Sequence, residues 1–133
     1  MATTTATLTL TSAYLTGDAL SFSSTATLTK ADSATGLDQT TGVARKFFAS
    51  TQSNTNLIAA ADYTAGKAHK VYIKNTSTSN SEFIKVEIGS SNTSLGFLYG
   101  GDFLFMPYDG ENDIDIDTSA VNMTVEFLVI YES

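Results

Sequence analysis

The chain of 133 residues has no cysteine, no tryptophan, one proline and one histidine. Without cysteine it forms no disulfide, no thiolate metal site and no cysteine nucleophile. Charged residues make up only 16% of the sequence, and polar surface comes instead from 21 threonines and 15 serines. The length fits one hydrophobic core. We therefore expect a single domain over residues 1–133, with the Thr-rich residues 1–30 as a candidate arm for contacts with other subunits or a shell.

Basic residues are also scarce, because seven Lys and Arg stand against 14 acidic residues, for a formal net charge of −7. Nucleic-acid binders use cations to displace counterions from phosphates, and anionic membranes attract basic segments. We therefore expect neither a nucleic acid nor a membrane as a partner. The charge is unevenly distributed, since residues 101–133 hold eight acids and no base. This split predicts surfaces of different charge within one domain.

Long apolar runs are missing as well. The longest ones, such as residues 57–61, fall far short of the roughly 18–20 residues of a membrane-spanning helix. Residues 1–5 carry neither the basic nor the apolar region of a secretory signal. We expect no signal peptide.

Alternation with a period of two dominates the sequence and is typical of strands. It is clear in residues 6–11, 83–88 and 113–117, and residues 121–131 form a long, mostly apolar segment. Roughly eight to ten short strands at regular spacing predict an all-β fold, an antiparallel β-sandwich of the jelly-roll type with at most one short helix. Pro107 cannot donate to a sheet, so its strand ends there or lies at an edge.

Two local features allow more than one interpretation. Residues 5–9 and 25–29 have the same sequence, Thr-Ala-Thr-Leu-Thr, which indicates either a hairpin of similar strands or a chance likeness of Thr-rich strands. Residues 57–70 are ambiguous: the run 57–61 could open a short helix of at most one or two turns, capped by Asn54 or Thr55 and ended by Gly66.

The densest group of carboxylates lies in residues 109–117. Asp113, Asp115 and Asp117 supply hard oxygen ligands of the kind that Ca²⁺ binds, although the spacing is not that of an EF-hand loop. The alternative is a strand with its isoleucines inward and a solvated acidic face outward. Calcium is the one cofactor that the sequence suggests.

Aromatic residues gather around a tight turn at Gly100 and Gly101. They are Phe97, Tyr99, Phe103, Phe105 and Tyr108. We expect them to serve in the core or in a subunit contact, and the alternative is a sugar-binding platform beside Asp102 and Asp109.

Catalytic motifs are not recognisable in the sequence. The single histidine, His69, has no recognisable nucleophile or orienting acid, and we interpret it as a surface or loop-packing residue. The chain lacks the phosphate-binding, zinc-protease and serine-hydrolase signatures. We therefore expect no catalytic residues and no enzymatic activity.

Three segments resemble small structural proteins in the virions of tailed bacteriophages, particularly cyanobacterial and marine phages. They are residues 61–64, residues 68–77 (Ala-His-Lys-Val-Tyr-Ile-Lys-Asn-Thr-Ser) and residues 95–107 (Leu-Gly-Phe-Leu-Tyr-Gly-Gly-Asp-Phe-Leu-Phe-Met-Pro). The resemblance implies a head decoration, cement or fibre protein that forms a homo-oligomer, with a trimer expected. Its partners would be the major capsid protein or other virion proteins, and its location the virion assembled in the host cytoplasm. The alternative is a receptor-binding or carbohydrate-binding domain of the tail or baseplate.

Overall fold

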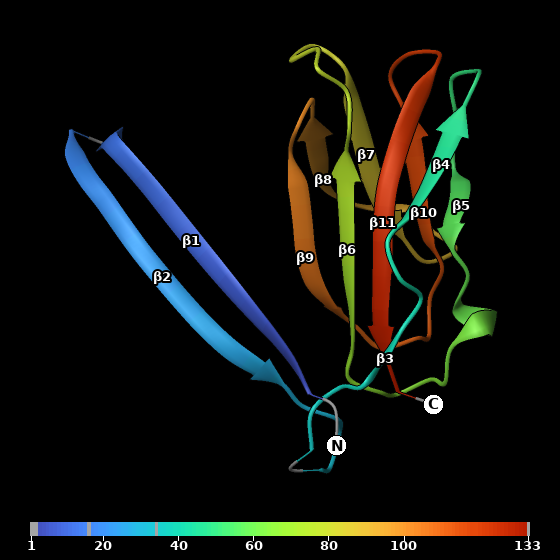
Figure 1. Cartoon of the computed structure of the whole chain (residues 1–133). Coiled ribbons are helices and arrows are strands. Elements are labelled where there is room, and N and C mark those ends of the chain that lie inside the picture. Colours follow the sequence, from blue (N-terminus) through green and yellow to red (C-terminus); the bar gives the residue numbers. More distant parts are fainter. Residues whose placement is uncertain (1–2, 16, 34, 133) are drawn as a thin grey trace. The chain divides into compact units, whose positions relative to one another are not determined.

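The computed structural model describes residues 3–15, 17–33 and 35–132. Contacts divide the chain into two compact units, residues 1–38 and residues 39–133 (Figure 1). The sequence predicted one domain with a candidate arm at residues 1–30. The candidate arm and the turn that follows it lie in the first of these units.

The first unit is a two-stranded ribbon. Strands β1 (Thr4–Leu15) and β2 (Asp18–Leu28) pair antiparallel, with Thr4 opposite Leu28 at one end and Leu15 opposite Asp18 at the other. The repeated sequence at residues 5–9 and 25–29 lies in and next to these paired strands, so the hairpin interpretation is the one that the structure supports.

The two faces of the ribbon differ in chemistry, because residues directly opposite each other share a face. The hydroxyl face carries Thr5, Thr7, Thr9, Thr11, Ser21, Ser23, Thr25 and Thr27. Hydrogen bonds link its side chains across the strands, at 2.8 Å for Thr7–Thr25 and 3.2 Å for Thr9–Ser23. The apolar ribbon face carries Thr4, Ala6, Leu8, Leu10, Ser12, Leu20, Phe22, Ser24, Ala26 and Leu28.

Among the residues of this unit whose burial is described, the buried ones lie at the base of the ribbon. Leu28 and Leu37 are buried there, and the Leu37 amide donates to the Leu28 carbonyl at 2.6 Å. The Thr4 hydroxyl donates to the Leu37 carbonyl at 2.7 Å. Further along the ribbon, Leu8, Leu10 and Phe22 remain 45–47% exposed.

The second unit is a sandwich of two antiparallel sheets. The front sheet contains β3 (Gln39–Thr40), β4 (Ala44–Phe48), β6 (His69–Asn75), β9 (Phe103–Tyr108) and β11 (Met123–Tyr131). The back sheet contains β5 (Thr55–Ile58), β7 (Phe83–Ile88), β8 (Thr93–Tyr99) and β10 (Ile114–Thr118).

Strand order in the two sheets is that of a jelly roll. The front order is β3-β11-β6-β9, with β4 also paired to β11, and the back order is β5-β10-β7-β8. From β4 onward the chain changes sheet after every strand except between β7 and β8, so the two sheets interleave along the sequence. The predicted all-β, jelly-roll-like sandwich is confirmed.

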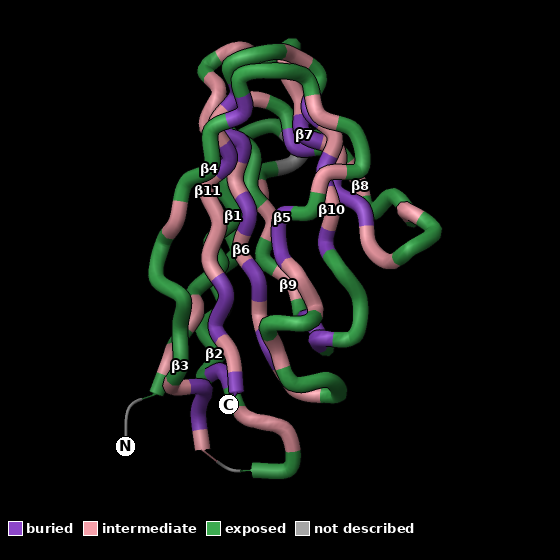
Figure 2. Tube along the Cα trace, turned by 90° about the vertical axis from the view of Figure 1, so that its right-hand side faces the viewer, coloured by how far each residue is buried: buried purple, intermediate pink, exposed green. Residues whose placement is uncertain are grey.

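The core lies between these sheets and follows the predicted alternation. Along β6 the residues are alternately buried and half-buried, and the same holds along β10. Figure 2 shows the buried residues in purple on β6, β7, β10 and β11. Fully buried side chains from the two sheets include Val71, Ile73, Val125, Ile84, Ile114 and Ile116.

Of the short helix that the sequence allowed in residues 57–66, the structure has one 3-10 turn. Residues 55–58 form the edge strand β5, in which Leu57 and Ile58 are buried against the core. The only helical turn in the described residues is a 3-10 turn, η1 (Ala60–Asp62), which has no side-chain cap and ends before Gly66. The apolar residues before the alanines gain more from pairing and burial than from extending a helix.

Candidate functional surfaces

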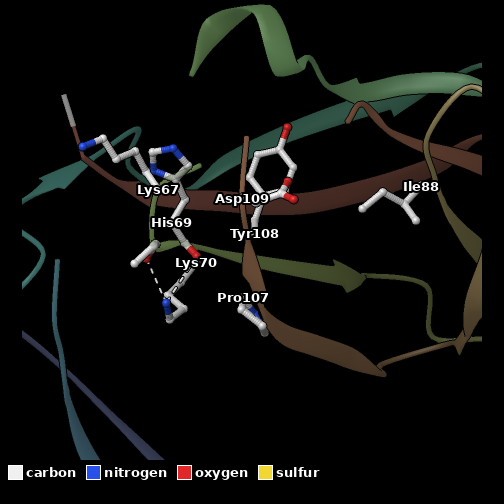
Figure 3. A pocket seen from close by; sticks show the side chains of 8 residues that line it. Lys67, His69, Lys70, Ile88, Pro107, Tyr108 and Asp109 are labelled. Carbon is white, nitrogen blue, oxygen red and sulfur yellow. Dashed lines mark hydrogen bonds between the residues drawn. The ribbon is translucent and has the colours of Figure 1, made fainter. Parts of the chain in front are cut away.

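A pocket of about 390 Å³ lies where β6 begins and β9 ends, and His69 is in its wall (Figure 3). His69 is fully buried, and both ring nitrogens are engaged. Nε2 lies 2.8 Å from the Thr64 carbonyl, and Nδ1 accepts from the Glu132 amide at 3.1 Å. The Glu132 carboxylate accepts from the Ala68 amide at 2.7 Å. The ring therefore joins a loop to the C-terminal strand, as the loop-packing interpretation predicted.

Two further polar side chains of this pocket, those of Lys70 and Tyr108, also bind backbone atoms. The Lys70 ammonium donates to the Ala68 carbonyl at 2.8 Å, one of the dashed lines in Figure 3. Its partial burial lowers the pKa of Lys70. The Tyr108 hydroxyl donates to the Asn112 carbonyl at 2.8 Å. The His69, Lys70 and Tyr108 side chains are therefore already used to hold the chain together.

Tyr108 is a core residue, one of the two roles predicted for this aromatic group, and it is not among the exposed aromatic residues. Its side chain is only 3% exposed, and it packs in the core beside His69 and Tyr63. Burial, with a smaller contribution from the nearby Asp113 carboxylate, raises the pKa of Tyr108 to about 12. The alternation of β9 explains the difference, because residues 104, 106 and 108 face inward while 103, 105 and 107 face outward.

The acidic segment forms a strand with its isoleucines inward. Ile114 and Ile116 are fully buried, and the three aspartates between and beside them face outward. This arrangement agrees with the strand interpretation of residues 113–117. The described residues contain no group of three or more His, Cys, Asp or Glu placed to hold a metal ion.

The aspartates bind separate partners instead of converging on one point. Asp113 accepts a hydrogen bond from the Ala60 amide at 2.8 Å. Asp117 accepts one from the Asn54 amide at 2.7 Å, and its other oxygen lies 3.3 Å from the Lys85 ammonium. These bonds fasten β5 and its flanking loops to β10.

Asp115 lies directly opposite Glu87 of β7, whose side chain is 1% exposed. One oxygen of each carboxylate, Oδ1 of Asp115 and Oε2 of Glu87, is buried without a hydrogen-bond partner in the described residues. The other Glu87 oxygen pairs with Lys85. Burial, followed by the charge of Asp113, raises the pKa of Asp115, and Glu87 adds to the effect. Like charges placed opposite each other make this pair a local source of repulsion.

The remaining predicted aromatic residues separate into two groups, because β8 and β9 lie in different sheets. Phe97 and Tyr99 lie on the outer face of the back sheet, where their rings contact Phe83 at centroid distances of 5.1 and 5.6 Å. Phe103 and Phe105 lie on the outer face of the front sheet. All four are 43–56% exposed.

The front group belongs to an apolar row that crosses three strands. Leu128 of β11 is opposite Tyr72 of β6, which is opposite Phe105 of β9. The Phe103 ring contacts Tyr72 at 6.0 Å, and Pro107 lies next to Phe105 on the same face of this edge strand. These five residues are called the front apolar surface below. Sequence reasoning missed Tyr72 and Leu128 because their alignment with Phe105 depends on sheet register.

The two outer faces of the sandwich also differ in charge. The strands of the front sheet present Arg45, Lys70 and Lys74 with one acid, Glu126. Those of the back sheet present Asp115 and Asp117 with one base, Lys85, which also pairs with the buried carboxylate of Glu87. The sequence predicted surfaces of different charge, and the structure distributes that difference between the sheets.

No protein-family model, curated protein or solved structure matches this chain. Within the described residues, no helix is long and apolar enough to span a membrane. The surfaces described above are therefore the basis for a functional proposal.

Proposed function

We propose that this chain is a non-enzymatic structural protein of a tailed-phage virion, most specifically a decoration or cement protein that binds the head surface. In this proposal it acts as a homo-oligomer, with a trimer expected, and its partner is the major capsid protein or another virion protein. The observation that carries the proposal is the ribbon, whose apolar face stays exposed along most of its length. Exposed apolar surface of this kind is typical of protein–protein contact.

The polar groups support a structural role as well. The histidine and tyrosine of the pocket bind backbone atoms, and the acidic segment fastens strands together. The unequal charge of the two sandwich faces suits a protein that lies on a shell in one orientation. The resemblance to virion proteins in residues 61–64, 68–77 and 95–107 supplies the choice of a phage virion.

Co-sedimentation with decoration-free phage heads tests the proposal. We expect the chain to pellet with heads up to a fixed stoichiometry, and to remain in the supernatant when the heads already carry bound chain. Light scattering of the free protein gives its oligomeric mass. Protein that stays in the supernatant with heads but pellets with purified tails would contradict a head location and favour the tail alternative.

Charge variants show which sandwich face meets the shell. The triple variant Asp113→Asn, Asp115→Asn, Asp117→Asn keeps oxygen acceptors for the backbone bonds and removes three charges from the back side. Lys74→Gln removes one charge from the front face and is compared with the single variant Asp113→Asn, which removes one charge from the back side. If one face meets the shell, one of these variants alters head binding more than the other.

A carbohydrate-binding domain of the tail or baseplate is the second candidate. The exposed back-sheet group of Phe83, Phe97 and Tyr99 is the observation that favours it, because aromatic faces stack on sugar rings. Asp102 beside it already accepts from the Tyr99 amide at 3.0 Å. Glycan-array binding that is lost in Tyr99→Ser and kept in Phe105→Ser would support this candidate over the first.

A further inference from the structure

The apolar ribbon face has no core of its own beyond the base. Leu8, Leu10 and Phe22 are 45–47% exposed, although they share one face of a regular hairpin. A two-stranded hairpin is marginally stable in water, and sheets need a third strand or a packed layer to persist. The ribbon therefore requires a partner that covers this face.

The chemistry of the ribbon restricts that partner. Asp18 is the only charged residue in residues 4–28, so the ribbon offers no charge pattern for a nucleic acid, a metal ion or an anionic lipid. Its partner must present an apolar surface with few charges at its centre.

The front apolar surface meets that requirement on this same chain. Its row of Leu128, Tyr72 and Phe105 has no charged member, and Lys70 and Lys74 lie beside it. This is the anatomy of an interface, an apolar centre with a polar rim. The rim lysines Lys70 and Lys74 meet no basic residue on the ribbon, because residues 4–28 contain no Lys or Arg.

We propose that the ribbon of one copy docks, by its apolar face, on the front apolar surface of a second copy, and that the exchange is reciprocal around a closed ring. The inference rests on the proposed function only in treating the chain as a homo-oligomer. A contact repeated around a ring leaves no copy with an uncovered ribbon.

The area of the ribbon favours exchange over a simple pairing of two ribbons. Residues 4–12 pair with residues 20–28. At about 3.3 Å per residue the paired part is about 30 Å long, and two strands of about 4.8 Å each make it about 10 Å wide, so each face has an area of roughly 300 Å². Two ribbons face to face would bury about 600 Å², less than the roughly 1,000 Å² of a specific interface. Two reciprocal contacts bury about 1,200 Å², and a ring of three buries more.

Because the chain has no cysteine, single cysteine substitutions give a direct test. We would mix Leu10→Cys protein with Phe105→Cys protein under mild oxidation. The expected product is a disulfide-linked species of twice the 14.1 kDa chain mass that contains one chain of each kind. Two matched controls, Thr9→Cys with Phe105→Cys and Leu10→Cys with Phe97→Cys, move one thiol to the opposite face and should lose most of this product.

Light scattering provides a second measurement that does not depend on disulfide geometry. Wild type should have two or three times the chain mass. Leu10→Ser and Phe105→Ser should fall to the monomer mass, whereas the controls Thr9→Ala and Phe97→Ser should keep the wild-type mass. All four positions are exposed, and circular dichroism checks that each variant is folded.

Several results would overturn the inference. They are a monomeric wild type, crosslinks only between two Leu10→Cys chains, and a crosslink within one chain of the double variant Leu10→Cys, Phe105→Cys. These measurements use the purified protein without phage heads. Failure here with retained head binding would therefore remove the docking mode and leave the proposed function standing.

Discussion

Asn75 is a buried polar residue at the end of β6 that ties three parts of the sandwich together. Its amide nitrogen donates to the carbonyls of Glu82 and Leu98, each at 3.0 Å, and its oxygen accepts from the Ser77 amide at 3.0 Å. Glu82 precedes β7 and Leu98 lies in β8, so one front-sheet side chain holds two segments of the back sheet. Replacing it by alanine should therefore destabilise the whole second unit.

The magnitude follows from the number of bonds lost. Three hydrogen bonds at a net value of about 1 kcal/mol each give a loss of about 3 kcal/mol in the free energy of unfolding. For a unit of this size each kcal/mol lowers Tm by about 4–8 °C, so Asn75→Ala should lower Tm by roughly 12–24 °C. Asn75→Asp keeps the acceptor oxygen and loses both donors, and should be destabilised as well.

Differential scanning calorimetry and urea unfolding followed by far-ultraviolet circular dichroism measure this loss. The control is Asn80→Ala in the same loop, where the side chain is exposed and the expected change is within about 0.5 kcal/mol. If Asn75→Ala costs less than about 1 kcal/mol, and no more than the control, the assignment of Asn75 as the tie between the sheets is refuted.

Three further predictions concern backbone space and ionisation in the second unit. Gly110→Ala should lower the free energy of unfolding by about 2–4 kcal/mol in urea, because φ is +77° and an added Cβ would lie 2.8 Å from the Thr64 carbonyl. The control Gly66→Ala, at φ +74° with nothing within 4 Å of the added Cβ, should cost only about 1–2 kcal/mol. Equal losses in the two variants would exclude the steric argument. Asp115→Asn should stabilise the protein at neutral pH by about 0.2–1 kcal/mol. The pKa of Asp115 is raised in the folded state, so wild type should lose stability as pH rises from below the ordinary Asp pKa through the folded value. The amide substitution removes this part of the pH dependence. Parallel stability–pH curves for the two proteins would contradict the prediction. Tyr108 should ionise near pH 12 in an absorbance titration, and the stability that its un-ionised, buried hydroxyl contributes should be lost as pH rises from 10 to about 12. If Tyr108→Phe removes only a titration step near pH 10, the result is inconsistent with burial of the hydroxyl.

Strand positions and inward faces could be predicted because they depend on local alternation. The isoleucines at 114 and 116 are fully buried and the residues between them face outward, as a period of two requires. Strand partners could not be predicted, because they depend on pairings across most of the chain. Met123, for example, lies opposite Phe48.

The errors have physical causes at particular residues. The alanines at 59–61 favour a helix locally, but Leu57 and Ile58 are buried as a strand beside β10. The aromatic residues near Gly100 and Gly101 are close in sequence, yet the turn joins strands of different sheets, and their outward side chains point away from each other. The Thr-rich composition of residues 1–30 marked a candidate arm, but it did not indicate that contacts would group this segment with residues 31–38.

The central position of β11 has a consequence for how the protein is made. This strand pairs with β3 and β4 on one side and with β6 on the other, so the front sheet is divided until residues 123–131 have been synthesised. The ribbon, by contrast, is complete by residue 28 and its contacts are local. During synthesis, β4 and β6 therefore keep an unpaired edge until β11 has been made, and during that interval the nascent chain is most exposed to misassociation.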